Sequence, residues 1–103
     1  MNVLVVEPMK APYEKEIESG LESLQHEVDG YIEALGLEDD ACIICNEEGK
    51  LKNLPYNITI FGVDFVGTLI LVGVNKDKFA DIPITFGRVI GNPISERIDE
   101  NNA

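Results

Sequence analysis

Residues 30–57 read GYIEALGLEDDACIICNEEGKLKNLPYN, and this stretch alternates apolar runs with polar, turn-forming residues. Tyr31–Leu35 and Ala41–Cys45 are rich in aliphatic and β-branched residues, so we expect two strands joined by an acidic loop. Asn46–Gly49 has the composition of a hairpin turn with its glycine at a positive φ, and Lys50–Leu54 is the expected return strand. The stretch therefore predicts antiparallel β-structure.

Further strands are expected on both sides of this stretch. Met1–Glu7 is an apolar run typical of a central strand, and Tyr13–Ile17 is expected to pair with it in antiparallel orientation. Later in the chain, Ile58–Val63 and Phe65–Val74 also have strand composition. A proline within Asp81–Phe86 places that segment at a sheet edge, because proline has no N–H to give to a ladder.

One short helix is predicted, over about Gly20–Asp29. Ser19 and Glu22 match the S-x-x-E capping box, in which the two side chains bond to N–H groups around the first turn. Gly30 follows where a left-handed C-terminal cap is expected. The apolar face of the helix consists of Leu21, Leu24, Gln25 and Val28.

Together these elements predict a single α+β domain over residues 1–98, with a mostly antiparallel sheet and the helix packed on one face. Gly62, Gly67 and Gly73 indicate bulges, bends or close backbone approach in the later strands. A curled, barrel-like sheet is therefore the alternative. Residues 99–103 are expected to form a disordered tail.

The charge of the chain is strongly negative and unevenly distributed. The net charge is −11 over 103 residues; residues 1–48 hold 13 acidic and two basic residues, whereas residues 49–103 hold six of each. Direct binding to nucleic acid or to an anionic membrane is disfavoured, because both need a basic footprint. No apolar run has the length of a membrane span and no signal peptide is recognised, so we expect a cytoplasmic protein.

The sequence predicts neither catalysis nor a cofactor. Cys42 and Cys45 form a C-x-x-C motif, but residues three apart on a strand point to opposite faces, which is poor geometry for one metal ion. We therefore expect two reduced structural thiols. The only histidine, His26, lies off the apolar face of the helix and is expected to be solvated. No hydrolase, metalloprotease, kinase or phosphate-loop motif is present in a suitable context, so we expect a protein that is not an enzyme.

The turn over residues 46–50 is the strongest candidate for a binding site. It places two carboxylates, an amide and an ammonium group on one short segment. Polar residues elsewhere in the same stretch extend this set, and the alternative is that all of them only form a well-ordered polar turn. The candidate ligand-binding residues are Tyr31, Glu33, Asn46, Glu47, Glu48, Lys50, Asn53 and Asn57.

Four segments carry a resemblance to a known family. They are Met1–Pro8, Leu21–Glu33, Asn46–Asn57 with its NEEGKL and LP-x-N motifs, and Gly67–Gly73. Their sequences resemble those of small bacterial and phage proteins grouped as the domain of unknown function 3846 family. The resemblance implies a protein encoded by a phage, prophage or conjugative element and working in the cytoplasm of a bacterial host.

Two positions depart from the family pattern. Asp29 stands where the family usually has glycine, and Ile58 follows Asn57 where arginine is common. The missing arginine weakens the expectation, implied by the resemblance, that this site binds an anion as relatives would.

The first functional hypothesis is an interaction inhibitor. Small acidic proteins from mobile elements are often anti-defence factors, and an acidic face is suited to the basic nucleic-acid-binding surface of a restriction or CRISPR effector. The candidate partner-binding residues are Glu14, Glu16, Glu18, Glu22 and Glu27.

The second hypothesis is a small-molecule binder that acts as a sponge for a nucleotide signal. Carboxylates of the candidate set would bind hydroxyl groups or base edges, Tyr31 would stack, and Lys50 would meet phosphate. A third hypothesis is an accessory protein with no defence target. A homodimer through an exposed apolar edge over Val66–Val74 is also expected.

Overall fold

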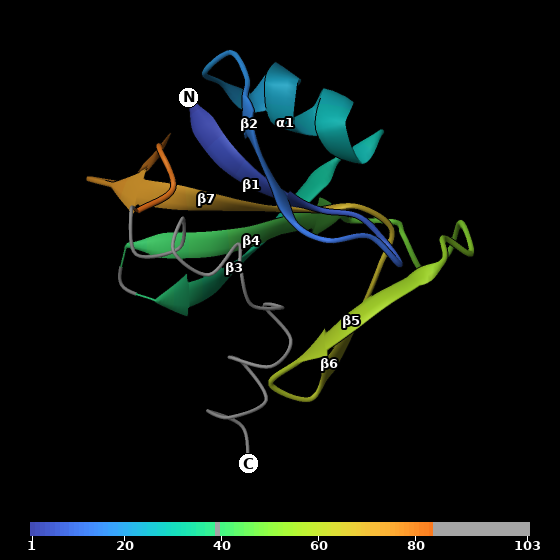
Figure 1. Cartoon of the computed structure of the whole chain (residues 1–103). Helices are drawn as coiled ribbons and strands as arrows, with labels where there is room; N and C mark the ends of the chain where they lie inside the picture. Colours follow the sequence, from blue (N-terminus) through green and yellow to red (C-terminus); the bar gives the residue numbers. More distant parts are fainter. Residues whose placement is uncertain (39, 84–103) are drawn as a thin grey trace.

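The computed structural model describes residues 1–38 and 40–83, and they form an α+β fold (Figure 1). The tail expected at residues 99–103 and part of the predicted domain lie outside the described residues. The elements in chain order are β1 (Asn2–Val6), β2 (Tyr13–Glu16), α1 (Leu21–Val28), β3 (Ile32–Glu38), β4 (Ala41–Asn46), β5 (Tyr56–Ile60), β6 (Val63–Val66), β7 (Leu69–Asn75) and β8 (Lys78–Ala80).

The described strands form one six-stranded antiparallel sheet and a separate hairpin. The order of the large sheet is β2-β1-β7-β4-β3, with β8 also paired to β7, while β5 and β6 pair with each other. The sheet is open, because its outer strands β2 and β3 do not pair with each other. The antiparallel sheet with one helix is confirmed, and the curled alternative is wrong.

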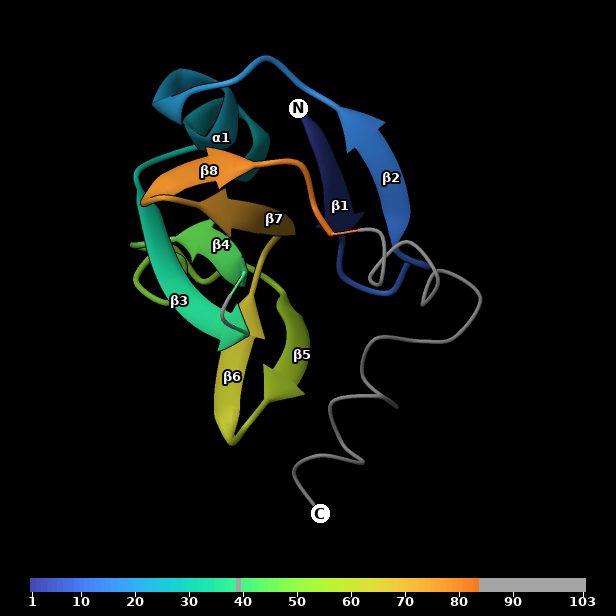
Figure 2. The same ribbon diagram turned by 90° about the vertical axis from the view of Figure 1, so that its left-hand side faces the viewer.

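Two hydrophobic clusters bury the two faces of the sheet. The helix face is covered by Leu24 and Val28 of α1, which pack on Val3, Val5, Ile44 and Ile70. The opposite face, here the hairpin face, packs against Ile60 of β5 and Phe65 of β6. Figure 2 shows α1 and the β5–β6 hairpin at opposite ends of the view, separated by the sheet. The molecule therefore has three layers.

Strand β7 is the centre of the sheet, and not the exposed edge that was expected at Val66–Val74. It pairs with β4 on one side and with β1 and then β8 on the other. Leu69–Val72 is completely buried. A continuous apolar run is typical of a strand buried on both faces, so the homodimer expected through this edge has lost its basis.

The helix forms where periodicity predicts it, but both of its predicted caps are wrong by one residue. Gly20 occupies the N-cap position and no side-chain cap bond forms, so the Ser19–Glu22 capping box is absent. At the other end Asp29, and not Gly30, adopts the left-handed conformation. The N–H of Gly30 then donates to the carbonyl of Gln25 at 3.0 Å, which completes a Schellman motif.

The segment after β4 turns repeatedly instead of returning as a strand. Backbone N–H groups of Lys52 and Leu54 donate to the carbonyls of Glu48 and Gly49 at 3.0 Å, so the expected strand Lys50–Leu54 is wrong. Gly49 does not have the positive φ expected of it; a Cβ there would instead lie 2.9 Å from Cγ2 of Val66. Close packing, and not turn geometry, therefore requires this glycine.

The later strands are divided differently from the prediction. Phe61 and Gly62 both have positive φ, which makes a two-residue hairpin turn between β5 and β6 inside the strand expected at Ile58–Val63. A short strand, β8, ends just before the edge strand predicted at Asp81–Phe86; residues 81–83 are not in a strand, and the last three predicted residues lie outside the described part of the chain.

Substitution of Gly73 tests the close packing of the central strand β7 against the backbone of Asp81. A Cβ at Gly73 would overlap the carbonyl oxygen of Asp81, whereas one at Gly36 of the edge strand β3 would meet nothing within 4 Å. Gly73→Ala is expected to lower the free energy of unfolding by about 1–3 kcal/mol because the backbone must shift. Gly36→Ala is the matched control and should change it by less than about 0.5 kcal/mol. Urea unfolding that gives equal values for the two variants would contradict the packing.

Candidate functional site

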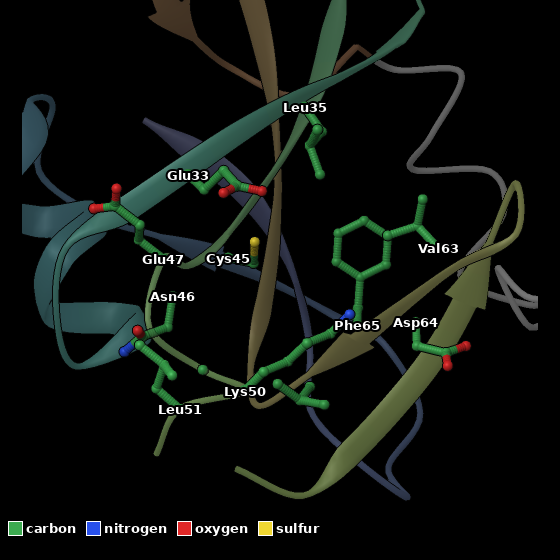
Figure 3. Close-up of a pocket in the computed structure, with 12 residues that line it drawn as sticks. Glu33, Leu35, Cys45, Asn46, Glu47, Lys50, Leu51, Val63, Asp64 and Phe65 are labelled. Carbon is green, nitrogen blue, oxygen red and sulfur yellow. The ribbon is translucent and has the colours of Figure 1, made fainter. Parts of the chain in front are cut away.

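A cavity of about 270 Å³ lies on the hairpin face, between the β3–β4 edge, the turn after β4 and strand β6 (Figure 3). We call it the turn pocket. It brings together four of the eight candidate ligand-binding residues, Glu33, Asn46, Glu47 and Lys50. Its remaining lining residues are Leu35, Cys45, Gly49, Leu51, Val63, Asp64, Phe65 and Val66.

The floor of the turn pocket is set by the register of β3 and β4. Glu33 lies directly opposite Cys45, so both side chains are on the hairpin face. Burial is the main cause that raises the pKa of the Cys45 thiol to about 11; the charge of Glu33 raises it further and that of Lys50 lowers it. Cys45 is therefore a neutral thiol, and one acidic and one basic group act on it.

Asn46 has a structural role at the edge of the turn pocket. It is 6% exposed, and its Nδ2 donates to the carbonyls of Val28 at 3.0 Å and Asp29 at 3.2 Å. Its Oδ1 accepts from the N–H of Glu48 at 2.8 Å. These bonds use both N–H groups of the amide and one acceptor site of its oxygen, so the main role of Asn46 is to position the turn.

The other four candidate ligand residues lie outside the turn pocket. Asn57 donates to the carbonyls of Val6 at 2.8 Å and Gly67 at 2.7 Å, which fastens the start of the hairpin to the sheet. Asn53 takes a left-handed turn conformation with φ 53°. Tyr31 is exposed, and Glu48 is half-buried on the turn. The expected single set of eight ligand residues is therefore divided.

Several residues of the turn pocket were missed by reasoning from the sequence. Leu51 is 84% exposed and Val63 is 45% exposed at its mouth, while Phe65 is 5% exposed in its wall. Val63 and Phe65 belong to β6, which lies far along the chain from β3. The signal for Leu51 was present, since an apolar residue inside a polar turn has no local reason to be there.

The acidic candidates gather around β2 and α1 but not on one face. A shallow groove of about 390 Å³ runs between these elements, and we call it the acidic groove. Its lining includes four of the five predicted acidic residues, Glu16, Glu18, Glu22 and Glu27, together with Lys15, Ile17, Ser23 and His26. His26 is exposed, as expected.

The register of β2 places its acidic and basic side chains on opposite faces. Glu14 pairs with Leu4, so it lies on the hairpin face, whereas Lys15 pairs with Val3 and lies on the helix face. There the Nζ of Lys15 contacts both carboxylate oxygens of Glu27, at 2.9 and 3.0 Å. This ion pair raises the pKa of Lys15, and it leaves Glu27 less available to a partner than the other acidic residues.

The two cysteines lie on opposite faces of the sheet, as the sequence predicts. Cys42 belongs to the helix-face cluster and Cys45 to the hairpin-face cluster, and both are free thiols. In the part of the chain that the structure describes, no group of three His, Cys, Asp or Glu residues could hold a metal ion. The one described helix is too short to cross a membrane.

Replacing Asn46 tests its structural role. Asn46→Ala is expected to lower the free energy of unfolding by about 2–3 kcal/mol, because it leaves two carbonyls and one N–H without their partner. Glu47→Gln, the next residue along and exposed, should change it by less than about 0.5 kcal/mol. Thermal or urea unfolding measures both; an Asn46→Ala protein as stable as the control would show that the three bonds contribute nothing.

The buried thiols predict a loss of stability at high pH. Folding raises the pKa of Cys45 from 9.0 to about 11. The neutral thiol therefore contributes its full share of the free energy of unfolding below pH 9, and this share is lost as the pH rises to 11. Burial raises the pKa of Cys42 in the same direction. The free energy of unfolding should fall by up to about 2 kcal/mol more for the wild type than for Cys45→Ala over this range. Parallel pH profiles for the two proteins would be the contrary result.

Comparison with known proteins identifies the family. The family model described as "Domain of unknown function (DUF3846)" matches residues 1–90 of the 103-residue chain. No curated protein and no solved structure matches the chain. The matched region contains β1 to β8, the turn pocket and the acidic groove. Because the match covers most of the chain, the chain belongs to the DUF3846 family.

Proposed function

We propose that this protein acts by binding and not by catalysis, and that it blocks a basic, nucleic-acid-binding surface of a bacterial host protein. A restriction or CRISPR effector in the cytoplasm is the proposed target. The observation that carries the proposal is the arrangement around β2: an exposed strand at the end of the sheet, whose four side chains are all exposed. Acidic residues border it on both faces.

The geometry supports an electrostatic interface at this edge. Glu14 lies on the hairpin face of β2, whereas Glu16, Glu18 and Glu22 line the acidic groove between β2 and α1. Lys15, the one lysine of the groove, is paired with Glu27. A partner that approaches the β2 edge therefore meets negative charge from both sides, and complementary charge speeds association.

The alternative role as a nucleotide sponge has less support. The turn pocket is lined by the carboxylates of Glu33, Glu47 and Asp64 and by a single ammonium group, that of Lys50. A nucleotide carries phosphate, which such a lining repels. Tyr31, which was expected to stack on a base, lies outside the turn pocket.

The proposal is tested by direct binding of purified restriction and CRISPR effector complexes to the immobilised protein. The test variant combines Glu14→Gln, Glu16→Gln, Glu18→Gln and Glu22→Gln. It is expected to bind its effector at least about tenfold more weakly than the wild type, because each lost charge removes part of the complementary field. The wild-type affinity should also fall between about 50 and 300 mM salt, because ions screen the attraction.

A control variant removes the same number of charges elsewhere. It combines Glu33→Gln, Glu47→Gln, Glu48→Gln and Asp77→Asn, none of which lies in the acidic groove. It should bind like the wild type. Equal losses in the two variants would show that total charge, and not the β2 edge, is responsible. Binding to no effector in the panel would favour the accessory role with no defence target.

A further inference from the structure

We propose that the turn pocket binds a small organic cation, namely an amine or guanidinium group carried on an apolar body. This site is separate from the β2 edge and does not depend on the proposed partner. The cavity of about 270 Å³ is close to the lower end of the range of small-ligand pockets, which start at about 300 Å³.

The walls of the turn pocket suit an apolar body. Phe65 and Leu35 contribute to the hairpin-face core, and their side chains form one wall of the cavity (Figure 3). Leu51 and Val63 stand at the mouth with large exposed areas. Apolar side chains that are exposed beside a cavity gain free energy when a ligand covers them. The apolar part of the ligand is therefore expected to contact both residues.

The charges of the turn pocket favour a cationic head group. The carboxylate of Glu33 extends toward the centre of the cavity, and Glu47 lies at its rim (Figure 3). Among the described residues neither Glu33 nor Glu47 has an ion-pair partner within 4 Å or a side-chain hydrogen bond. A carboxylate beside apolar walls forms strong hydrogen bonds to an ammonium or guanidinium group.

The two remaining charged residues have other roles. Asp64 pairs with Thr59 on the outer side of the hairpin, and its Oδ1 accepts from Oγ1 of Thr59 at 2.6 Å. The aliphatic stem of Lys50 runs along the cavity toward Phe65 (Figure 3), which leaves its ammonium group to oppose a bound cation. Replacement of Glu33 and of Lys50 should therefore change the affinity in opposite directions.

The turn pocket is held in shape before any ligand arrives. Asn46 fixes the turn to the end of α1, and Gly49 packs so closely on β6 that a Cβ added there would lie 2.9 Å from Cγ2 of Val66. A preformed site avoids the entropy cost of ordering its walls on binding. These contacts come from the turn and from β6, so the cavity is defined by tertiary structure and not by one loop.

The test is an NMR titration of the whole protein with phenethylammonium chloride, with 3-phenylpropionate as the anion of matched shape. The ammonium compound is expected to give saturable shifts of the Leu51, Val63 and Phe65 amides at concentrations up to about 20 mM. Glu33→Gln should weaken its binding about tenfold or more, because a charge-assisted hydrogen bond is lost. Lys50→Gln should strengthen it about two- to fivefold, because a like charge is removed.

Glu48→Gln is the matched control, because it removes one carboxylate from the same turn without touching the cavity lining. Its affinity for phenethylammonium should equal that of the wild type. Equal binding of the anion, shifts confined to other residues, or no saturable shift would overturn the proposal. So would a weakening by Lys50→Gln, which would indicate that the ammonium group of Lys50 attracts part of the ligand.

Discussion

The side chain of Asn46 makes the contacts on which the arrangement of the site depends. It is the only polar side chain buried in the described part of the chain, and its three bonds serve two places: two reach the end of α1 and the third stays within the turn after β4. Two of them satisfy carbonyls at the end of α1, which a helix leaves without internal partners. The third holds the N–H of Glu48 and sets the direction of the turn. One amide therefore fixes the helix to β4 and also places the turn over the cavity.

The uneven charge of the sequence becomes understandable once the register of the sheet is known. The first strand has no room for charge, because Val3, Leu4 and Val5 are buried between both neighbouring layers. Its outer neighbour β2 is exposed and carries Glu14 and Glu16, and charged side chains on an outer strand also protect the end of a sheet against unwanted pairing. Lys15 is placed toward α1 by its register and meets Glu27 there. A surface pair of this kind contributes little stability. It does distinguish Glu27, which is paired, from the four other candidate partner-binding residues.

The sequence was sufficient for the parts of the fold that follow from a repeating pattern. The spacing of Leu24 and Val28 predicts the helix, and the apolar runs predict most strands. Features that depend on one residue were not predictable: Gly20 displaced the expected serine cap, and Asp29 took the left-handed position expected for Gly30. The cavity was only half predictable. The sequence indicates Glu33 and Lys50, because they are polar residues near a turn. Phe65 lines the same cavity only because the β5–β6 hairpin folds onto the sheet, and no local sequence pattern predicts that arrangement.

The two residues expected to differ from the family, Asp29 and Ile58, have separate physical roles in this structure. Asp29 has φ 57° at the end of α1, a conformation in which glycine is unstrained and aspartate is tolerated, so either residue fits the backbone at this position. Ile58 is different, because it pairs with Phe65 and packs against the hairpin-face core. An arginine at this position would bring a positive charge to the β5–β6 hairpin beside the turn pocket. With isoleucine there, the carboxylates outnumber the ammonium group of Lys50 in the cavity lining, and the local charge of this protein is suited to a cation.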